Sequence, residues 1–114
     1  MRSPSADRDR GSVTAEFAVA LPAIALVLAA CLASVVLVAQ QVRLTDAAAD
    51  AARALGRGES AAEAAAIADR VSGGASIATW TEDPFVCVAL SRRGSGVLAA
   101  VELHAESCAV GGGR

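Results

Sequence analysis

Residues 17–39 read FAVALPAIALVLAACLASVVLVA, and this stretch decides the fold of the chain. Its 23 residues carry no charge, and Ser34 is their only polar side chain. At about 1.5 Å per residue, a helix of this length rises about 34 Å, which is enough to cross a hydrocarbon core of about 30 Å. Because lipid offers no hydrogen bonds, a single spanning segment has to be helical. The stretch therefore predicts one transmembrane helix, in which the Ser34 hydroxyl bonds to a carbonyl one turn back.

Two other kinds of apolar segment are less consistent with this length. A buried core helix is disfavoured, because 114 residues can hardly surround a helix that is apolar on every side. A cleaved secretory signal usually has an apolar region of about 7–15 residues, followed by a cleavage site. Here the run is longer and continues into Gln40-Gln41-Val42-Arg43 with no clear small-x-small site. A membrane anchor is the favoured interpretation.

The segment before the apolar run carries one acidic residue at the boundary. It reads Asp9-Arg10-Gly11-Ser12-Val13-Thr14-Ala15-Glu16-Phe17. A carboxylate at the centre of a membrane helix costs about 2.5–3.5 kcal/mol on insertion scales, and less at the edge. The N-terminus of a helix also favours an anion. Glu16 therefore has two interpretations, an interfacial helix cap or a charge kept for a partner.

This arrangement resembles a type IV prepilin: a short basic leader, a Gly, four residues, a Glu followed by an aromatic residue, and a long apolar helix. In such proteins a membrane peptidase cuts after the Gly, and the Glu is the fifth residue of the mature chain. The resemblance implies a cut after Gly11, a new N-terminus at Ser12, and a role in assembly and subunit registry for Glu16 and Phe17. The Glu16 carboxylate would neutralise the amine of Ser12 on the same or a neighbouring subunit.

Within the prepilins, three sequence features resemble the TadE-like minor pilins of tight-adherence pilus systems. They are RGSVTAEFA at residues 10–18, its continuation AVALP at 18–22, and the Ala-rich DAAADAAR at 46–53. The likeness is good over roughly residues 9–57. It implies a cytoplasmic N-terminus and an extracytoplasmic C-terminal domain. Charge alone barely decides the orientation, because Arg residues lie at similar distances on both sides of the run, at 2, 8 and 10 and at 43, 53 and 57.

The helix is expected to continue beyond the membrane without a breaker, as a stalk that ends near Gly56 and Gly58. Charged residues recur on one stripe, with ion pairs expected for Arg43–Asp46 and Asp50–Arg53. The opposite face is apolar but shallow and consists of Leu44, Ala48, Ala51, Ala52 and Leu55. In one interpretation, the stripe is only the solvated face of an amphipathic helix. In the other interpretation, the small Ala residues let a helix of another subunit approach closely.

The rest of the chain predicts a small α+β domain. Ser60 and Glu63 form a capping-box pattern before a short second helix, which Gly73-Gly74 ends. Asp83-Pro84 is a turn signal between candidate strands at 76–81 and 85–92. A third strand is expected at 97–105, after a two-residue turn at Gly94-Ser95. The expected pairs are Leu90–Ala99, Val88–Val101, Val86–Leu103, Cys87–Glu102 and Phe85–His104.

The fold class expected from the whole chain is α+β, with a long N-terminal transmembrane helix extended as a stalk, a short second helix, and a small antiparallel sheet of 2–3 strands with a hairpin. The leader, which is polar, is expected to be disordered until it is removed. The domain organisation follows as a leader at 1–11, a transmembrane helix and stalk at 12–56, an extracytoplasmic domain at 57–110 and a flexible tail at 111–114.

The three Cys residues have separate interpretations. Cys31, within the membrane helix, is expected to be a small apolar filler. Cys87 and Cys108 point to the same face of the predicted sheet, in a compartment that permits oxidation, and a disulfide between them would help a domain too small to be held by burial alone. In the expected register the two lie six residues apart, so the tail would have to fold back to bridge them. A metal site is not expected, since there is one His and no Cys-x-x-Cys pair.

No motif indicates an enzyme. His104, with Glu102 and Glu106 nearby, is expected to be a rim residue of a half-exposed strand, and there is no Gly-x-Ser-x-Gly elbow or phosphate loop. The net charge of −2 gives no support for nucleic-acid binding. We therefore expect no catalytic residues, no cofactor and no metal.

The expected function is that of a membrane-anchored minor pilin or pseudopilin that takes part in assembly of a tight-adherence pilus or a related secretion apparatus. Its expected partners are the lipid bilayer, a prepilin peptidase, and other pilins through the N-terminal helix. Two alternatives stay open. One is an uncleaved single-pass accessory subunit of a secretion or pilus platform that never enters a fibre. The other is a small secreted domain whose mature chain starts after Ala39.

Overall fold

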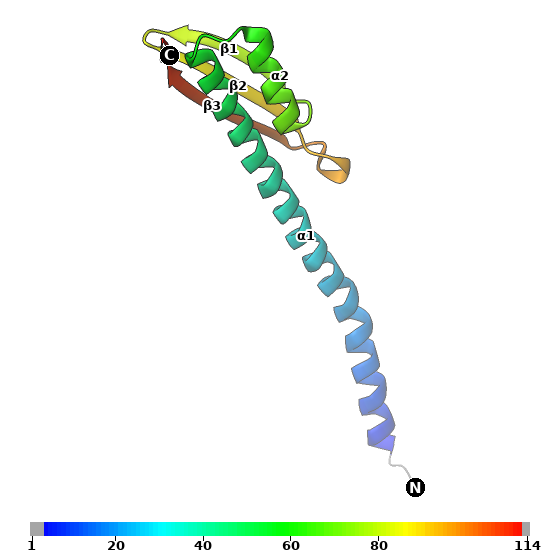
Figure 1. Cartoon of the computed structure of the whole chain (residues 1–114). Helices are drawn as coiled ribbons and strands as arrows, with labels where there is room; N and C mark the ends of the chain where they lie inside the picture. Colours follow the sequence, from blue (N-terminus) through cyan, green and yellow to red (C-terminus); the bar gives the residue numbers. More distant parts are fainter. Residues whose placement is uncertain (1–3, 113–114) are drawn as a thin grey trace. The chain divides into compact units, whose positions relative to one another are not determined.

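The computed structural model describes residues 4–112 and consists of two helices, a three-stranded sheet and one short 3-10 turn (Figure 1). The elements are α1 Pro4–Gly56, α2 Ala61–Ser72, β1 Ser76–Glu82, β2 Phe85–Arg93, η1 Gly96–Leu98 and β3 Glu102–Val110. The predicted fold class is confirmed. Residues 1–3 of the expected leader and 113–114 of the expected tail lie outside the described residues. The chain divides into two compact units, residues up to 35 and residues from 36 onward.

α1 begins earlier than the sequence predicts. It starts at Pro4, so the described part of the leader, which we expected to be disordered, is helical. Pro suits the first position of a helix because no N–H is needed there. The next breaker is Gly11, and a single Gly costs only about 1 kcal/mol relative to Ala, too little to end a helix. Further along, the Ser34 hydroxyl donates to the Ala30 carbonyl at 2.8 Å, as predicted.

Gly58 caps the C-terminus of α1. Its positive φ of 89° places it in the left-handed region, which Gly adopts at little cost. The N–H of Gly58 donates to the carbonyl of Leu55, and the N–H of Glu59 donates to that of Ala54, both at 3.0 Å. This hydrogen-bond pair is the Schellman motif, and it satisfies two of the last carbonyls of the helix.

α2 follows at once and has the predicted capping box. The N–H of Glu63 donates to the Ser60 hydroxyl at 3.2 Å, and the N–H of Ser60 donates to the Glu63 carboxylate at 3.0 Å. These two bonds satisfy otherwise unpaired backbone donors at the start of the helix. Gly73, with φ 76°, ends α2 in the left-handed conformation, as predicted.

The sheet is antiparallel with strand order β1-β2-β3. β1 and β2 form a hairpin in which Glu82 lies opposite Phe85, so Asp83-Pro84 is its two-residue turn, as predicted. β2 and β3 form a second antiparallel pair with a much longer connection, residues 94–101. Within this connection the N–H of Gly94 donates to the Val101 carbonyl at 2.9 Å.

The predicted register of β2 with the third strand is wrong. Its five pairs are replaced by Leu90–Ala105, Val88–Ser107, Val86–Ala109, Cys87–Cys108 and Phe85–Val110. Each partner lies six residues later than expected, and the strand is 102–110 rather than 97–105. Because six is even, the shift leaves every β2 residue on the face that we predicted, and alternation along the strand cannot distinguish the two registers.

The core lies between the sheet and the helices of the second unit. Val88 and Leu90 of β2 and Ala105 of β3 are buried on the sheet face that α1 and α2 cover (Figure 1). Apart from Leu44, the helices contribute only small residues to this core, which are Ala47, Ala48, Ala51, Ala52, Ala54, Ala64 and Ala68. Side chains this small let helix and sheet approach closely, so the core is thin.

This packing decides between the two interpretations of the Ala-rich face. The face is covered by the protein's own sheet and second helix, so the interpretation that it receives a helix of another subunit is wrong. The charged stripe is solvated, with Arg53 and Asp50 paired at 2.8 Å and both side chains largely exposed. Such a pair contributes only about 0.3–0.5 kcal/mol. The expected Arg43–Asp46 pair is not formed in the described part of the chain.

Candidate functional site

The first candidate site is the apolar segment of α1 from residue 11 to residue 39. None of its side chains is buried. Apart from Leu37, which is half-buried, its large apolar side chains are more than two-fifths exposed, from Val36 at 45% to Val19 at 75%. Within Gly11–Gly56, an 18-residue stretch has a mean hydropathy of 2.7 and none of it is buried, so the helix is long and apolar enough to cross a membrane. Water strongly disfavours such a surface, which therefore requires a lipid or protein partner.

Glu16 and Ser12 lie one turn apart on the same face of this helix. Ala15, Val19, Ala20 and Ala23 share that face at spacings of three and four residues, and with Ser12 and Glu16 they border a shallow groove of about 490 Å³. Side chains on a helix lean toward its N-terminus, which aims the Glu16 carboxylate toward Ser12. The structure thus brings together the two predicted residues that the resemblance assigned to one charge pair.

Phe17 stands beside Glu16 and is 61% exposed. Together with Glu16, Ala20 and Ile24 it borders a second shallow groove of about 330 Å³. Its large apolar ring is therefore available for a partner.

Gly11 has no packing role in the structure. A Cβ atom built on it would meet nothing within 4 Å. Its φ is not positive, so its backbone conformation is one that any residue can adopt. Gly inside a helix is nevertheless destabilising by about 0.5–1 kcal/mol relative to Ala. The structure gives no folding reason for Gly at this position.

Cys87 and Cys108 are joined by a disulfide across β2 and β3, with their Cα atoms 4.1 Å apart. They lie directly opposite each other, so the tail does not fold back as the predicted register required. Cys87 is fully buried and Cys108 is exposed. Trp80 of β1 is the direct neighbour of Cys87 on the same sheet face, the one turned away from the helices. Cys31 is a free, exposed cysteine on the apolar segment.

His104, the single His of the chain, lies near Glu106 of the same strand. The His104 Nε2 lies 3.7 Å from a carboxylate oxygen of Glu106, and both side chains are more than half exposed. Glu102 lies opposite Arg93 at the end of the β2–β3 ladder, two residues from His104. Among the described residues, no group of three or more His, Cys, Asp or Glu side chains could hold a metal ion.

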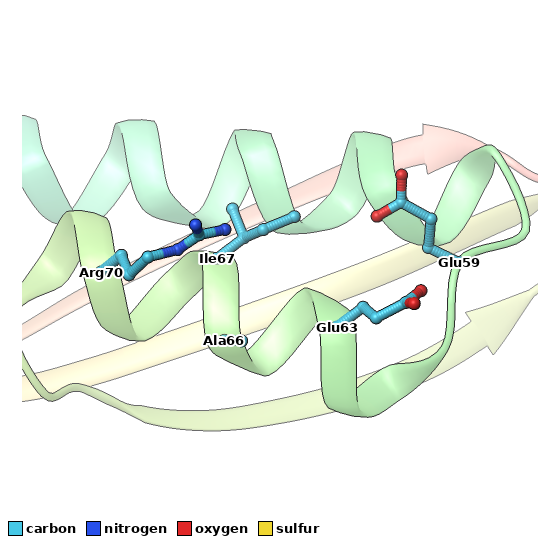
Figure 2. A pocket seen from close by; sticks show the side chains of 5 residues that line it. All are labelled: Glu59, Glu63, Ala66, Ile67 and Arg70. Atoms are coloured by element: carbon cyan, nitrogen blue, oxygen red, sulfur yellow. The ribbon is translucent and has the colours of Figure 1, made fainter.

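A surface depression of about 440 Å³ beside α2 is a further candidate, which the sequence did not indicate (Figure 2). Glu59, Glu63, Ala66, Ile67 and Arg70 line it. Its two carboxylates already have partners: Glu59 is paired with Arg57 at 3.0 Å, and Glu63 caps the helix. The depression has no convergent free polar groups of the kind that ligand sites use, so we assign it no function.

The comparisons with known proteins concern the apolar segment. A family model described as TadE-like protein matches residues 11–53. The predicted resemblance is thus confirmed over that range, which contains Gly11, Ser12, Glu16 and Phe17. No curated protein and no solved structure matches the chain.

Proposed function

We propose, with the TadE-like character of residues 11–53 as the premise, that this protein is a membrane-anchored minor pilin or pseudopilin in the assembly of a tight-adherence pilus or a related secretion apparatus. The observation that carries the proposal is the contrast between the two units. The second unit has its own core and a disulfide, whereas the apolar segment buries nothing. The segment is therefore the part that the protein offers to other molecules.

In this proposal the segment first lies in the bilayer, with the N-terminus cytoplasmic and the C-terminal domain extracytoplasmic. A prepilin peptidase then cuts between Gly11 and Ser12. A Gly that packs against nothing supports this step, because a bulky side chain there would change recognition without changing the fold. The role is non-enzymatic, and the partners are the peptidase, the bilayer and other pilins.

After cleavage the amine of Ser12 would be a positive charge at the edge of an apolar helix. An unpaired charge in such a place is strongly disfavoured, so it requires a counter-charge. Glu16 is one turn away on the same face and is exposed, so its carboxylate can reach the amine of its own chain or of a neighbouring subunit. Pairing between subunits would fix how far one helix slides along the next.

One observation favours a second function, the uncleaved accessory subunit. α1 runs without interruption from Pro4 through Gly11, so the proposed cleavage site is helical. A peptidase that needs extended backbone would first have to unwind this turn. In the accessory role the leader stays attached, and the apolar segment serves only to anchor the chain and to contact a platform.

The processing step is tested by Gly11→Val in cells that contain the peptidase. We expect the native chain to lose its first 11 residues and the variant to keep them, as measured by the intact mass of protein extracted from membranes. The second unit should be unaffected, since nothing lies within 4 Å of the added side chain. If the variant had the same shortened mass as the native chain, the assigned cleavage site would be wrong. A native chain that starts at Met1 would favour the accessory subunit.

The registry role is tested by Glu16→Gln, which removes the charge and keeps the shape. We expect normal removal of the leader but a large loss of the protein from sheared pili, because the amine of Ser12 loses its partner. Asp46→Asn is the matched control: it neutralises an exposed carboxylate on the same helix, beyond the apolar segment. Equal amounts of Glu16→Gln and Asp46→Asn protein in the pili would refute the registry role.

A further inference from the structure

The connection between β2 and β3 is an apolar surface segment. Residues 94–101 read GSGVLAAV and contain no charge. Within it, η1 presents Val97 at 95% exposure, the highest of any large apolar side chain in the described residues, and Val101 is 39% exposed. Single exposed apolar residues are normal on a protein surface, whereas contiguous exposed apolar surface marks contact with a protein or a membrane. Val97 and Val101 lie close together in one uncharged segment, which makes that segment a candidate for such a contact.

The connection is fastened to the place where the apolar run of α1 ends. Gln40, the first residue after that run, donates from its side-chain amide to the Ser95 hydroxyl at 3.2 Å. The oxygen atom of the same side-chain amide, Oε1, is buried. Gln41 donates from its side chain to the carbonyl of His104, just after the connection, at 2.9 Å. Residues 36–39, the end of the apolar run, belong to the same compact unit as the connection.

Within the second unit, the two ends of the domain can be told apart by their contacts with α1. α1 contacts β3 again at Gly56, where a Cβ atom would lie 3.0 Å from the carbonyl oxygen of Val110. From Gln41 to Gly56 the helix rises about 22 Å, at roughly 1.5 Å per residue. From His104 to Val110 the strand rises about 20 Å, at roughly 3.4 Å per residue. The two elements therefore run side by side in the same direction, and the start of α2, soon after Gly56, lies at the far end.

We propose that residues 96–101 lie in the interfacial layer of the bilayer as a second, shallow membrane contact beside the helix. The inference rests on the proposed membrane anchoring of α1. If the bilayer ends near Ala39, the hydrogen bond from Gln40 holds the connection at that surface, and Val97 and Val101 meet the acyl boundary. Arg93 and Glu102 flank the connection in the sequence, and Arg43 lies three residues after Gln40. All three side chains are exposed, as charged side chains at the level of the lipid headgroups would be.

A second membrane contact would fix the orientation of the outer domain relative to the bilayer. A helix alone leaves its outer domain free to tilt over the membrane, whereas two contacts fix the domain relative to the bilayer surface. The sheet face that carries Trp80 and the disulfide would then be held at a constant angle. Anchoring by a helix together with an apolar loop also places the start of α2 at the point farthest from the lipid.

The test uses the full chain in vesicles of phosphatidylcholine and phosphatidylglycerol, with Trp80→Phe to remove the native fluorophore. A new tryptophan is placed either in the connection, as Val97→Trp, or at the far end, as Ala62→Trp. Both positions are exposed, so neither change disturbs the core. We expect blue-shifted emission and strong quenching by brominated acyl chains for Val97→Trp, and emission like that of tryptophan in water, with little quenching, for Ala62→Trp.

The outcomes separate the two proposals. If the protein floats with the vesicles but Val97→Trp is quenched no more than Ala62→Trp, the loop contact is wrong and the helical anchor stands. If the protein does not float, the anchoring itself fails. A blue shift at Val97→Trp that is insensitive to brominated lipid but grows with the protein-to-lipid ratio would show contact with a second copy, and this too would overturn the lipid contact.

Discussion

The packing of α1 against the sheet makes the replacement Leu44→Ala an informative perturbation. Leu44 is 1% exposed, and the fully buried side chains of the described residues include only four large ones, Leu44, Leu90, Val88 and Cys87. Replacing a buried Leu by Ala costs about 2–5 kcal/mol. A unit of the size of residues 36–112 has a total stability of roughly 4–12 kcal/mol at typical values per residue. The single change should therefore remove a large fraction of the stability of the outer domain.

The fluorescence of Trp80 makes the measured free energy of unfolding specific to the outer domain. It is the only Trp in the chain and lies on β1, so its fluorescence follows unfolding of the sheet while the apolar segment stays silent. The full chain in detergent micelles is unfolded with urea, and the free energy is extrapolated to water. The matched control is Val42→Ala, two residues earlier on the same helix and 54% exposed, which should change the stability by less than about 0.5 kcal/mol.

The result that would refute the reasoning is a Leu44→Ala stability within error of Val42→Ala. Residues 36–56 would then not be part of the folded domain. Their Ala-rich face would again be available for a helix of another subunit, and the correction reported above would be withdrawn.

Two further predictions concern the same domain, again with Trp80 fluorescence as the readout. Replacing Cys108 by Ser removes a cross-link between residues separated by 21 positions, and should cost about 3 kcal/mol on the loop-entropy estimate. A stability equal to that of the native chain under oxidising conditions would show that the disulfide does not form in the membrane-bound protein. Gly56→Val forces a side chain against the backbone oxygen of Val110 and should cost about 1–3 kcal/mol, whereas Gly11→Val should leave the unfolding of the domain unchanged. Equal midpoints for these two Gly variants would contradict the close approach of α1 and β3.

Some of this fold follows from local chemistry that is readable in the chain. The uncharged run from residue 17 to residue 39 leaves a helix as the only solution in lipid. Ser60 and Glu63 satisfy each other's backbone donors, so their spacing alone predicts where α2 begins. Asp83-Pro84 lies between two β-rich segments and predicts a hairpin, because the conformation of a tight turn is determined by the residues of the turn itself.

The features of the fold that the sequence did not predict depend on contacts between residues that are far apart in the chain. Val86, Val88 and Leu90 can pair either with residues 99–103 or with residues 105–109, and both registers place these three side chains on the covered face. The observed register adds the Cys87–Cys108 pair, which alternation along one strand does not reveal. The Gly-rich Arg93-Gly94-Ser95-Gly96 favoured a tight turn, but the chain uses it to begin a longer connection.

The geometry of the candidate site follows from the sequence more directly than the fold does, because it depends on neighbours along one helix. Ser12 and Glu16 share a face by helical spacing alone, and Phe17 is exposed on the same helix. The Ala-rich face was misassigned for the opposite reason. Small side chains suit a close approach by any partner, and the chain's own sheet proved to be that partner.

The central claim is that the exposed apolar segment anchors a chain whose leader is removed before assembly. It is tested most directly by the N-terminal sequence of the native protein, recovered from cells that contain the tight-adherence apparatus after their membranes have been washed at alkaline pH. Our account predicts that the protein stays with the washed membranes and that its sequence starts at Ser12. A chain that is released into the soluble fraction and still starts at Met1 would contradict it.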